Sequence, residues 1–484
     1  MENDQIKSKT LSNMVWRFAE RCGAQGVAFI VSVVLARLLT PTEYGTVALI
    51  TVFTAVFQVF VDSGMGNALI QKKDADQLDF STVFYFNVVM CLVVYAALFV
   101  SAPLIAAFYG DPSLTAMTRV VGLTIVIAGL KNIQQAYVSR HLLFRKFFFA
   151  TLAGTVTAGV VGIAMAYLGF GAWAIVAQQV INTLIDTIIL YITVKWRPTK
   201  QFSMERLKSL FGFGWKLLAS SLLDTVYNNL RSLIIGKFYS SEDLAYYNKG
   251  KQIPNVVVSN INTSIDSVLL PVMSQEQEHA DRVKSMLRRS IKTSTYIMAP
   301  MMMGVAFVAE PLVRLLLTEK WLPCVFYLRI FCITYMFYPI HTANLNAIKA
   351  MGRSDLFLKL EIAKKVVGLA AVGISMWFGV EAMAYSLLVT SVTSQIINSW
   401  PNRKLLNYSY LSQLKDILPG ILLAVFMGFC TLPVTWLGLP DILMLILQVL
   451  VGVIVYVGGS VLLKMESFYY ILGMVKPYIR KVRK

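Results

Sequence analysis

One stretch of the sequence places six polar side chains at the spacing of a single helical face. They recur every three or four residues between residues 244 and 270: Asn248, Gln252, Asn255, Ser259, Asn262 and Asp266. Because an α-helix has 3.6 residues per turn, the six side chains share one face. Lys249 and Lys251 lie beside that face. Amides, hydroxyls and ammonium groups in this arrangement can hold a polar, anionic ligand through hydrogen bonds and charge.

The rest of the chain is strongly apolar. Of its 484 residues, 57% are hydrophobic and 14% are charged, and the mean hydropathy is +0.63. This composition is typical of a polytopic membrane protein. An isolated charge at the bilayer centre costs about 2.5 to 3.5 kcal/mol even on the most lenient insertion scale. The polar face must therefore line water, a polar ligand or other polar protein, and it predicts a hydrophilic path through the membrane. A polar interface between subunits is the alternative.

Composition and motifs exclude several classes of function. The net charge of +18 could suggest nucleic-acid binding, but the basic residues lie in short loops between apolar stretches, where they set membrane topology. The five cysteines have no metal-ligand spacing, and the chain lacks a GxxxxGK[ST] phosphate-binding motif. We therefore expect no catalytic residue, no metal, no organic cofactor and no ATP hydrolysis. The N-terminus leads into an apolar run without a cleavage site, which predicts a first membrane helix.

The apolar segments predict an all-α polytopic membrane protein with fourteen spans. The spans lie near residues 12–36, 44–68, 82–108, 113–138, 147–168, 171–194, 209–236, 244–270, 288–317, 322–348, 355–378, 381–400, 411–436 and 441–464. Most Lys and Arg residues fall in the N-terminus, the tail and the loops after even-numbered spans. Because positive charge stays in the cytoplasm, both termini are expected there.

An internal repeat divides the spans into two lobes. The run from Arg37 to Gly45 aligns with the run from Lys237 to Ala245, 200 residues later, and each has a basic residue, a polar acidic turn and a helix start. Six spans separate the copies, so both have the same orientation. We expect pseudo-symmetric parallel lobes of six helices around a central cavity. They comprise residues 1–200 and 201–404, followed by two extra helices in 405–465 and an amphipathic tail, 466–484, on the membrane surface.

Polar side chains from other spans are expected to line the same cavity. Several cations in a cavity of low dielectric bind an anion strongly, and amides between them suit a polyhydroxylated group. The expected substrate-binding residues are Arg17, Arg21, Lys131, Asn228, Arg231, Asn248, Lys249, Lys251, Gln252, Asn255 and Asn262. The candidates for coupling to an ion gradient or to the membrane potential are Asp62, Asp224 and Asp266.

Some polar residues have a structural alternative. Arg17 and Arg21 lie near the end of the first span, where they could extend to the lipid headgroups. The stripe from Gln178 to Asp186 is better explained by hydrogen bonds between helices. His341 is a lone histidine, for which a structural role is favoured.

Three motifs resemble those of a known family. They are the opening run Trp16–Arg21, the turn Leu35–Gly45 and the end of the second span, Asp62–Gly66. With the fourteen spans, they are similar to the Wzx-type polysaccharide flippases of the multidrug, oligosaccharidyl-lipid and polysaccharide exporter superfamily. The resemblance is closest to the branch of lipopolysaccharide and teichuronic acid biosynthesis, and it covers nearly the whole chain. It implies a fold like that of multidrug exporters and the lipid II flippase.

The resemblance also implies an activity. A family member translocates an undecaprenyl-diphosphate-linked oligosaccharide across the bacterial cytoplasmic membrane by alternating access, together with other polysaccharide assembly proteins. In such folds spans 1 and 8 border one lateral opening and spans 2 and 7 the other. This implies that Arg17, Arg21, Lys249 and Lys251 lie at or near the substrate path.

Two alternatives stay open at this point. A drug or small-cation exporter of the same fold would need an acidic cavity, whereas this chain offers more lysine and arginine. A membrane glycan polymerase or ligase would need a long outer loop with catalytic Arg or His, and the expected outer loops are short.

Overall fold

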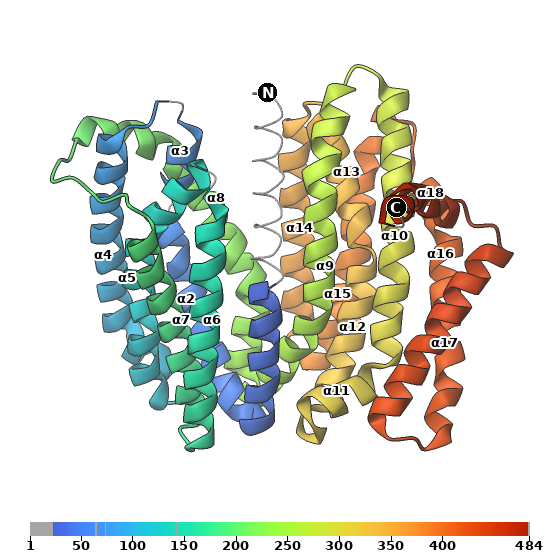
Figure 1. Ribbon diagram of the computed structural model, residues 1–484, viewed down its shortest axis with the longest axis horizontal. Helices are drawn as coiled ribbons and strands as arrows, with labels where there is room; N and C mark the ends of the chain where they lie inside the picture. The colour runs from blue at the N-terminus through green and yellow to red at the C-terminus, as the bar shows by residue number, and fades with distance from the viewer. Residues whose placement is uncertain (1–22, 63–64, 73, 142, 483–484) are drawn as a thin grey trace. The chain divides into compact units, whose positions relative to one another are not determined.

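The computed structural model describes residues 23–62, 65–72, 74–141 and 143–482. Within these residues the fold consists of helices and contains no β-strand (Figure 1). The chain forms two compact units, Met1–Ala245 and Tyr246–Lys484, and each is described by itself below.

The first unit contains eight described helices. They are a helix over Gly23–Leu38, α2 (Pro41–Asp62), α3 (Met65–Gln71), α4 (Gln77–Tyr109), α5 (Ser113–Arg140), α6 (Phe144–Tyr167), α7 (Ala172–Thr193) and α8 (Met204–Phe238). Small residues permit their close packing: a Cβ atom at Gly154 of α6 would lie 2.9 Å from the amide oxygen of Asn182 on α7. This is the small-residue packing typical of membrane helices.

The second unit begins within α9 (Ser241–Gln275). It continues through α10 (Ala280–Phe307), α11 (Ala309–Leu317), η1 (Glu319–Trp321), α12 (Cys324–Met336), α13 (Tyr338–Ala350), α14 (Ser354–Ser375), α15 (Val380–Leu405), α16 (Tyr410–Thr431), η2 (Leu432–Leu437), α17 (Asp441–Leu462) and α18 (Glu466–Val482). The predicted lobe boundary at residue 200 precedes α8, whereas α8 groups with the first unit. The predicted division into domains stays a prediction.

The multi-pass membrane fold predicted from the sequence is confirmed. Ten described helices are long and apolar enough to cross a membrane, or eleven if α10 and α11, bent by 68°, form one broken span. Within the described residues each expected span falls on a helix or a helix pair, and the part of the first span before residue 23 lies outside them. α8 and α14 are not among the ten. Charged residues such as Arg206 and Asp224 in α8 and Glu361 in α14 lower their apolar character. The predicted count of fourteen is therefore not established.

The two copies of the repeated turn have the same local structure. In the first, Thr40 and Glu43 form a capping box: the Glu43 carboxylate accepts from the Thr40 backbone N–H (2.7 Å), and the Thr40 hydroxyl accepts from the Glu43 N–H (3.3 Å). In the second, Ser240 and Asp243 make the equivalent bonds at 3.2 and 3.0 Å. Such boxes satisfy amides that a helix leaves unpaired at its start. The shared turn supports the predicted repeat.

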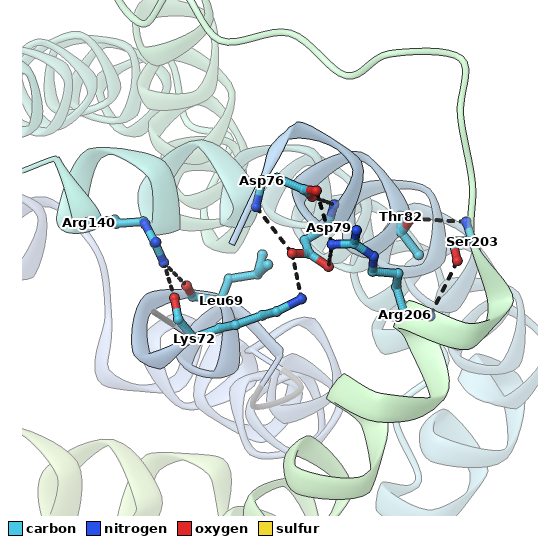
Figure 2. A network of polar contacts seen from close by, with 8 residues as sticks. All are labelled: Leu69, Lys72, Asp76, Asp79, Thr82, Arg140, Ser203 and Arg206. Atoms are coloured by element: carbon cyan, nitrogen blue, oxygen red, sulfur yellow. Dashed lines mark hydrogen bonds and ion pairs between the residues drawn. The ribbon is translucent and has the colours of Figure 1, made fainter. Parts of the chain in front are cut away.

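A buried carboxylate ties together one end of the first unit. Asp79, in the first turn of α4, is 0% exposed, and its carboxylate meets Lys72 Nζ at 2.6 Å and an Arg206 guanidinium nitrogen at 3.0 Å. Asp76 caps α4 by accepting from the Asp79 backbone N–H (2.9 Å) and also pairs with Arg206 (3.1 Å). Figure 2 shows these contacts joining the segment after α3, the start of α4 and the start of α8.

The same end of the unit holds the connection from α7 to α8. The Trp196 indole N–H donates to the Gln77 side chain at 2.6 Å, and the Gln77 amide donates to the Arg197 carbonyl at 2.6 Å. The Ser203 N–H donates to the Thr82 hydroxyl at 3.1 Å, and the Ser203 hydroxyl caps α8. Hydrogen bonds therefore join this connection to α4 near both of its ends. They fix the position of the start of α8 against α4.

The C-terminal helix docks on α10. Lys292 of α10 forms an ion pair with Glu466 at the start of α18, and the Arg289 guanidinium lies 5.1 Å from the ring centre of Tyr470. The hydrogen bond from Lys292 lowers the pKa of the Glu466 carboxyl below its usual value. These contacts fix the start of the predicted amphipathic tail; its location on the membrane surface stays a prediction.

The Asp79 cluster gives a testable prediction. Asp79→Asn keeps the side-chain size but removes the charge that Lys72 and Arg206 share. We expect a loss of about 2 to 3 kcal/mol in the free energy of unfolding, the range for hydrogen bonds to charged groups near a buried ion. Thermal unfolding of the detergent-solubilised protein would show a lower melting temperature. Asp74→Asn, at an exposed position of the same segment, is the matched control. Equal melting temperatures of the two variants would contradict the prediction.

Candidate functional site

A cluster of charged and polar side chains lies on three helices of the first unit, α2, α5 and α7, that are long and apolar enough to cross a membrane. Lys131 of α5 and Asp186 of α7 form an ion pair of 2.7 Å, with side chains only 15% and 11% exposed. The next residue of α5, Asn132, donates to the carboxylate of Asp62, the last residue of α2, at 3.4 Å. Two residues selected from the sequence, Lys131 and Asp62, are thus brought to adjacent positions on α5 and α2.

The pairing confirms the structural role favoured for Asp186. Its carboxylate accepts a hydrogen bond from Lys131 of another helix, as expected for contacts between helices, and the donor is a cation. Because Lys131 faces a carboxylate at 2.7 Å, its charge is largely compensated. Lys131 therefore has a structural role, and its expected role in substrate binding stays a prediction.

The polar face that the spacing predicts lies in the second unit, on α9. α9 is one continuous helix from Ser241 to Gln275 despite Pro254 and Pro271, so the six side chains do lie on one helix. Asn255 and Asp266 are exposed, whereas the other four are half-buried: Asn248, Gln252, Ser259 and Asn262. Asp266 accepts a hydrogen bond of 2.7 Å from the Asn346 side chain of α13. The face thus offers amides and a hydroxyl for hydrogen bonding.

The two lysines of α9 lie in different surroundings. Lys249 is 6% exposed, and its ammonium lies 5.6 Å from the ring centre of Trp321, a cation–π contact. Next to it, a Cβ atom at Gly250 would lie 2.6 Å from Tyr327, so α9 approaches α12 closely here. Lys251 is half-buried. A cation buried at membrane depth marks a functional position more often than not.

The seventh predicted span supplies three more selected residues. Asp224, Asn228 and Arg231 lie on α8 at intervals of four and three residues, and so on one helical face. Asp224 and Asn228 are exposed, and Arg231 is half-buried. Arg17 and Arg21 lie outside the described residues.

A second group of polar residues was missed. Asn344 of α13, Asn402 of α15 and Gln413 of α16 are fully buried and bonded to one another: the Asn344 and Gln413 amides exchange hydrogen bonds of 2.8 and 3.0 Å, and Asn402 donates to Asn344 at 2.7 Å. One turn earlier on α15, Asn398 lies 3.2 Å from His341 Nδ1. The network consists of amide side chains that hydrogen-bond to one another, and it joins α13, α15 and α16.

The sequence did contain a signal for this group. Along α15, polar residues recur at the same intervals as on α9: Ser391, Gln395, Asn398 and Asn402. In α15 all four are buried, whereas the α9 residues are exposed or half-buried. The spacing identifies a polar face, and only the structure shows whether other helices already satisfy it. In the part of the chain that the structure describes, no group of His, Cys, Asp and Glu could hold a metal ion.

Comparison with known proteins identifies one matching family and several relatives. Residues 34–326 match the model of a family described as polysaccharide biosynthesis protein. The chain is similar to the succinoglycan biosynthesis transport protein ExoT of Rhizobium meliloti, with 25% identity over 80% of this chain and 79% of the relative. It is also similar to the teichuronic acid biosynthesis protein TuaB of Bacillus subtilis, with 24% identity over 87% and 88% of the two chains.

Solved structures show the same fold. The lipid II flippase MurJ in its inward closed conformation matches with a TM-score of 0.73 and 14% identity, over 93% of this chain and 99% of that chain. An inward-facing multidrug resistance MATE family transporter matches with a TM-score of 0.63 and 14% identity, over 79% and 94%. These matches confirm the fold that the resemblance implied, and the relatives confirm a transporter rather than an enzyme.

The buried ion pair gives the prediction of this section. Lys131→Met and Asp186→Leu each leave one charge without its partner at membrane depth, so each is expected to cost about 3 to 5 kcal/mol of stability. The double variant removes both charges and should recover most of that loss. Thermal unfolding of the four proteins in one detergent measures the coupling. If the two losses simply add, Lys131 and Asp186 do not stabilise each other.

Proposed function

The chain belongs to the polysaccharide biosynthesis protein family, and from this premise we propose that it translocates an undecaprenyl-diphosphate-linked oligosaccharide across the bacterial cytoplasmic membrane. It is a multi-pass membrane transporter of the flippase type. Relatives of this kind are transport and biosynthesis proteins, which leaves the glycan polymerase or ligase alternative without support. The proposed partners are the lipid-linked glycan, the bilayer and other polysaccharide assembly proteins.

The polar face of α9 is the observation on which this proposal rests. A diphosphate-sugar headgroup cannot cross hydrocarbon unaided, because each polar group would lose its hydrogen bonds to water. The face from Asn248 to Asn262 offers half-buried amides, which can replace those bonds. Lys249 and Lys251 on the same helix, and Arg231 on α8, would attract the diphosphate. The headgroup would use the polar face of α9 while the lipid tail stays in the bilayer.

The orientation is also part of the proposal. The basic connections include the one from α7 to α8, with Lys195, Arg197 and Lys200. By the positive-inside rule these connections lie in the cytoplasm, together with both termini. The same rule would place the Asp79 cluster and α18 on the cytoplasmic side. Substrate made in the cytoplasm would then enter the protein from that side.

Coupling to an energy source is proposed without any bound cofactor. Asp62, Asp224 and Asp266 are the acidic candidates for a proton, a sodium ion or the membrane potential. Asp62 and Asp266 each accept from a neighbouring asparagine, so a change in their charge would alter a contact between helices.

A drug or small-cation exporter is the second candidate, because the MATE transporter shares the fold. Such an exporter would confer drug resistance when overproduced, and its loss would leave polysaccharide precursors unchanged. The proposed flippase gives the opposite result: lipid-linked oligosaccharide accumulates in cells that lack it, and sensitivity to drugs does not change.

The cations on α8 and α9 give a prediction about export. Arg231→Ala and Lys251→Ala should each lower export of the lipid-linked glycan about ten-fold or more, since a hydrogen bond to a charged group contributes about 1.5 to 3 kcal/mol. Both variants should remain in the membrane in normal amounts. Export is measured as surface polysaccharide in cells lacking the wild-type protein. Lys200→Ala, an exposed position in the connection before α8, is the control. Unchanged export in both variants would count against this binding surface.

A separate prediction concerns coupling. In proteoliposomes with an imposed ion gradient, Asp266→Asn should lose the acceleration of transport by the gradient while keeping the acceptor oxygen for Asn346. Asp62→Asn and Asp224→Asn test the other two candidates in the same assay. Transfer of a fluorescent lipid-linked oligosaccharide between leaflets is the readout. Transport that continues after uncouplers collapse every gradient would remove ion coupling, but it would leave the flippase proposal standing.

A further inference from the structure

An apolar recess lies between α4 and the start of α8, within the first unit. Its volume is about 590 Å³. Phe86 and Met90 of α4 form one wall, and Leu207, Phe211 and Trp215 of α8 form the other. Phe86 and Phe211 meet edge to face, with ring centres 6.1 Å apart, while Phe211 and Trp215 remain 39% and 47% exposed. The recess is therefore open to the outside along Phe211 and Trp215.

The recess lies at the depth of lipid chains. At 1.5 Å per residue, Phe86 and Met90 are about 13 and 20 Å along α4 from its first residue, Gln77. The hydrocarbon layer is about 30 Å thick, so one leaflet contributes about 15 Å. α4 has 33 residues and is about 50 Å long, which exceeds the hydrocarbon thickness by about 20 Å. With that excess shared between its two ends, Phe86 and Met90 lie about 3 and 10 Å inside the hydrocarbon, within the leaflet at the end where α4 and α8 both begin. An acyl chain of that leaflet has the matching length and chemistry.

A single cation adds charge selectivity. Lys208 lines the recess one turn before Phe211, and no acidic residue lines it. Among the described residues Lys208 makes no hydrogen bond or ion pair, and it is exposed. The neighbouring cation Arg206 is committed to Asp76 and Asp79, whereas the Lys208 ammonium is available to a ligand. A lysine above an apolar recess at headgroup level is complementary to a lipid phosphate.

We propose that this recess binds one anionic phospholipid, with an acyl chain between Met90 and Trp215 and its phosphate at Lys208. The bound lipid would fill the space between α4 and α8 and so brace the start of α8. The proposal concerns a resident lipid of one leaflet, and it does not depend on the transported substrate.

Gly212 permits a test that blocks the recess without removing any contact. A Cβ atom at Gly212 would have no neighbour within 4 Å, so Gly212→Leu places its side chain in open space within the recess. Lys208→Gln removes the charge and leaves the apolar walls. The matched controls are on α14, where Gly373 also has open space and Lys359 is exposed: Gly373→Leu and Lys359→Gln.

The experiment uses the full chain in nanodiscs of phosphatidylcholine that contain brominated phosphatidylglycerol or, at the same mole fraction, brominated phosphatidylcholine. The contribution of Trp215 is the difference in fluorescence quenching between the wild type and the Trp215→Phe variant. In the wild type and both controls, phosphatidylglycerol should quench Trp215 at about five-fold lower mole fraction than phosphatidylcholine, the effect of one lysine near an anionic headgroup. In Lys208→Gln the two lipids should quench Trp215 at the same mole fraction. In Gly212→Leu the quenching by both lipids should fall to the level expected of bulk lipid.

Two results would overturn the proposal. Equal quenching by the two lipids in the wild type would mean that the recess meets only bulk lipid. A preference for phosphatidylglycerol that survives both substitutions would place the lipid elsewhere. Circular dichroism and size-exclusion profiles of Lys208→Gln and Gly212→Leu establish that both variants are folded, so a lost preference reports on the recess itself.

Discussion

Hydrocarbon offers no hydrogen-bond partner, so every polar group at membrane depth must find one within the protein, in water or in a ligand. This constraint accounts for several buried polar contacts in the structure. Lys131 is held by Asp186, Asp266 by Asn346, and Asn344 by Gln413 and Asn402. The polar face of α9 differs from these, because its amides are exposed or half-buried rather than enclosed by other helices. It is the part of the described membrane region that is best suited to meet a ligand.

Both units satisfy the constraint with polar contacts between helices. In the first unit the Asp79 cluster and the Lys131–Asp186 pair use charges. In the second unit the contacts among α13, α15 and α16 use amide side chains, and Arg288 of α10 forms an ion pair with Asp416 of α16 at 2.6 Å. Charged pairs are costly to bury but strongly penalise any rearrangement that separates them. The first unit is thus fixed most firmly at the end where α4 and α8 start.

Sequence reasoning succeeded where the interaction is local in the chain. The repeated turns are capping boxes within four residues, and the α9 face follows from helical periodicity, so both could be predicted. Sequence reasoning did not succeed where the interacting residues are far apart in the sequence. Lys131 and Asp186 lie 55 residues apart, and the α15 stripe has the spacing of a ligand-binding face although it is buried. The 68° bend between α10 and α11 was not predicted either, although Glu310 and Pro311 stand directly after it in the sequence.

The contacts described above have a consequence for transport. The ion pairs and side-chain hydrogen bonds named here join residues within one unit: Lys131 with Asp186 in the first, and Asp266 with Asn346 in the second. A flippase that works by alternating access must move its lobes as bodies around the substrate. Pairs that lie inside one unit do not have to separate in such a motion. Residues that change surroundings must then be ones that tolerate both water and ligand, and the exposed and half-buried amides of α9 meet that requirement.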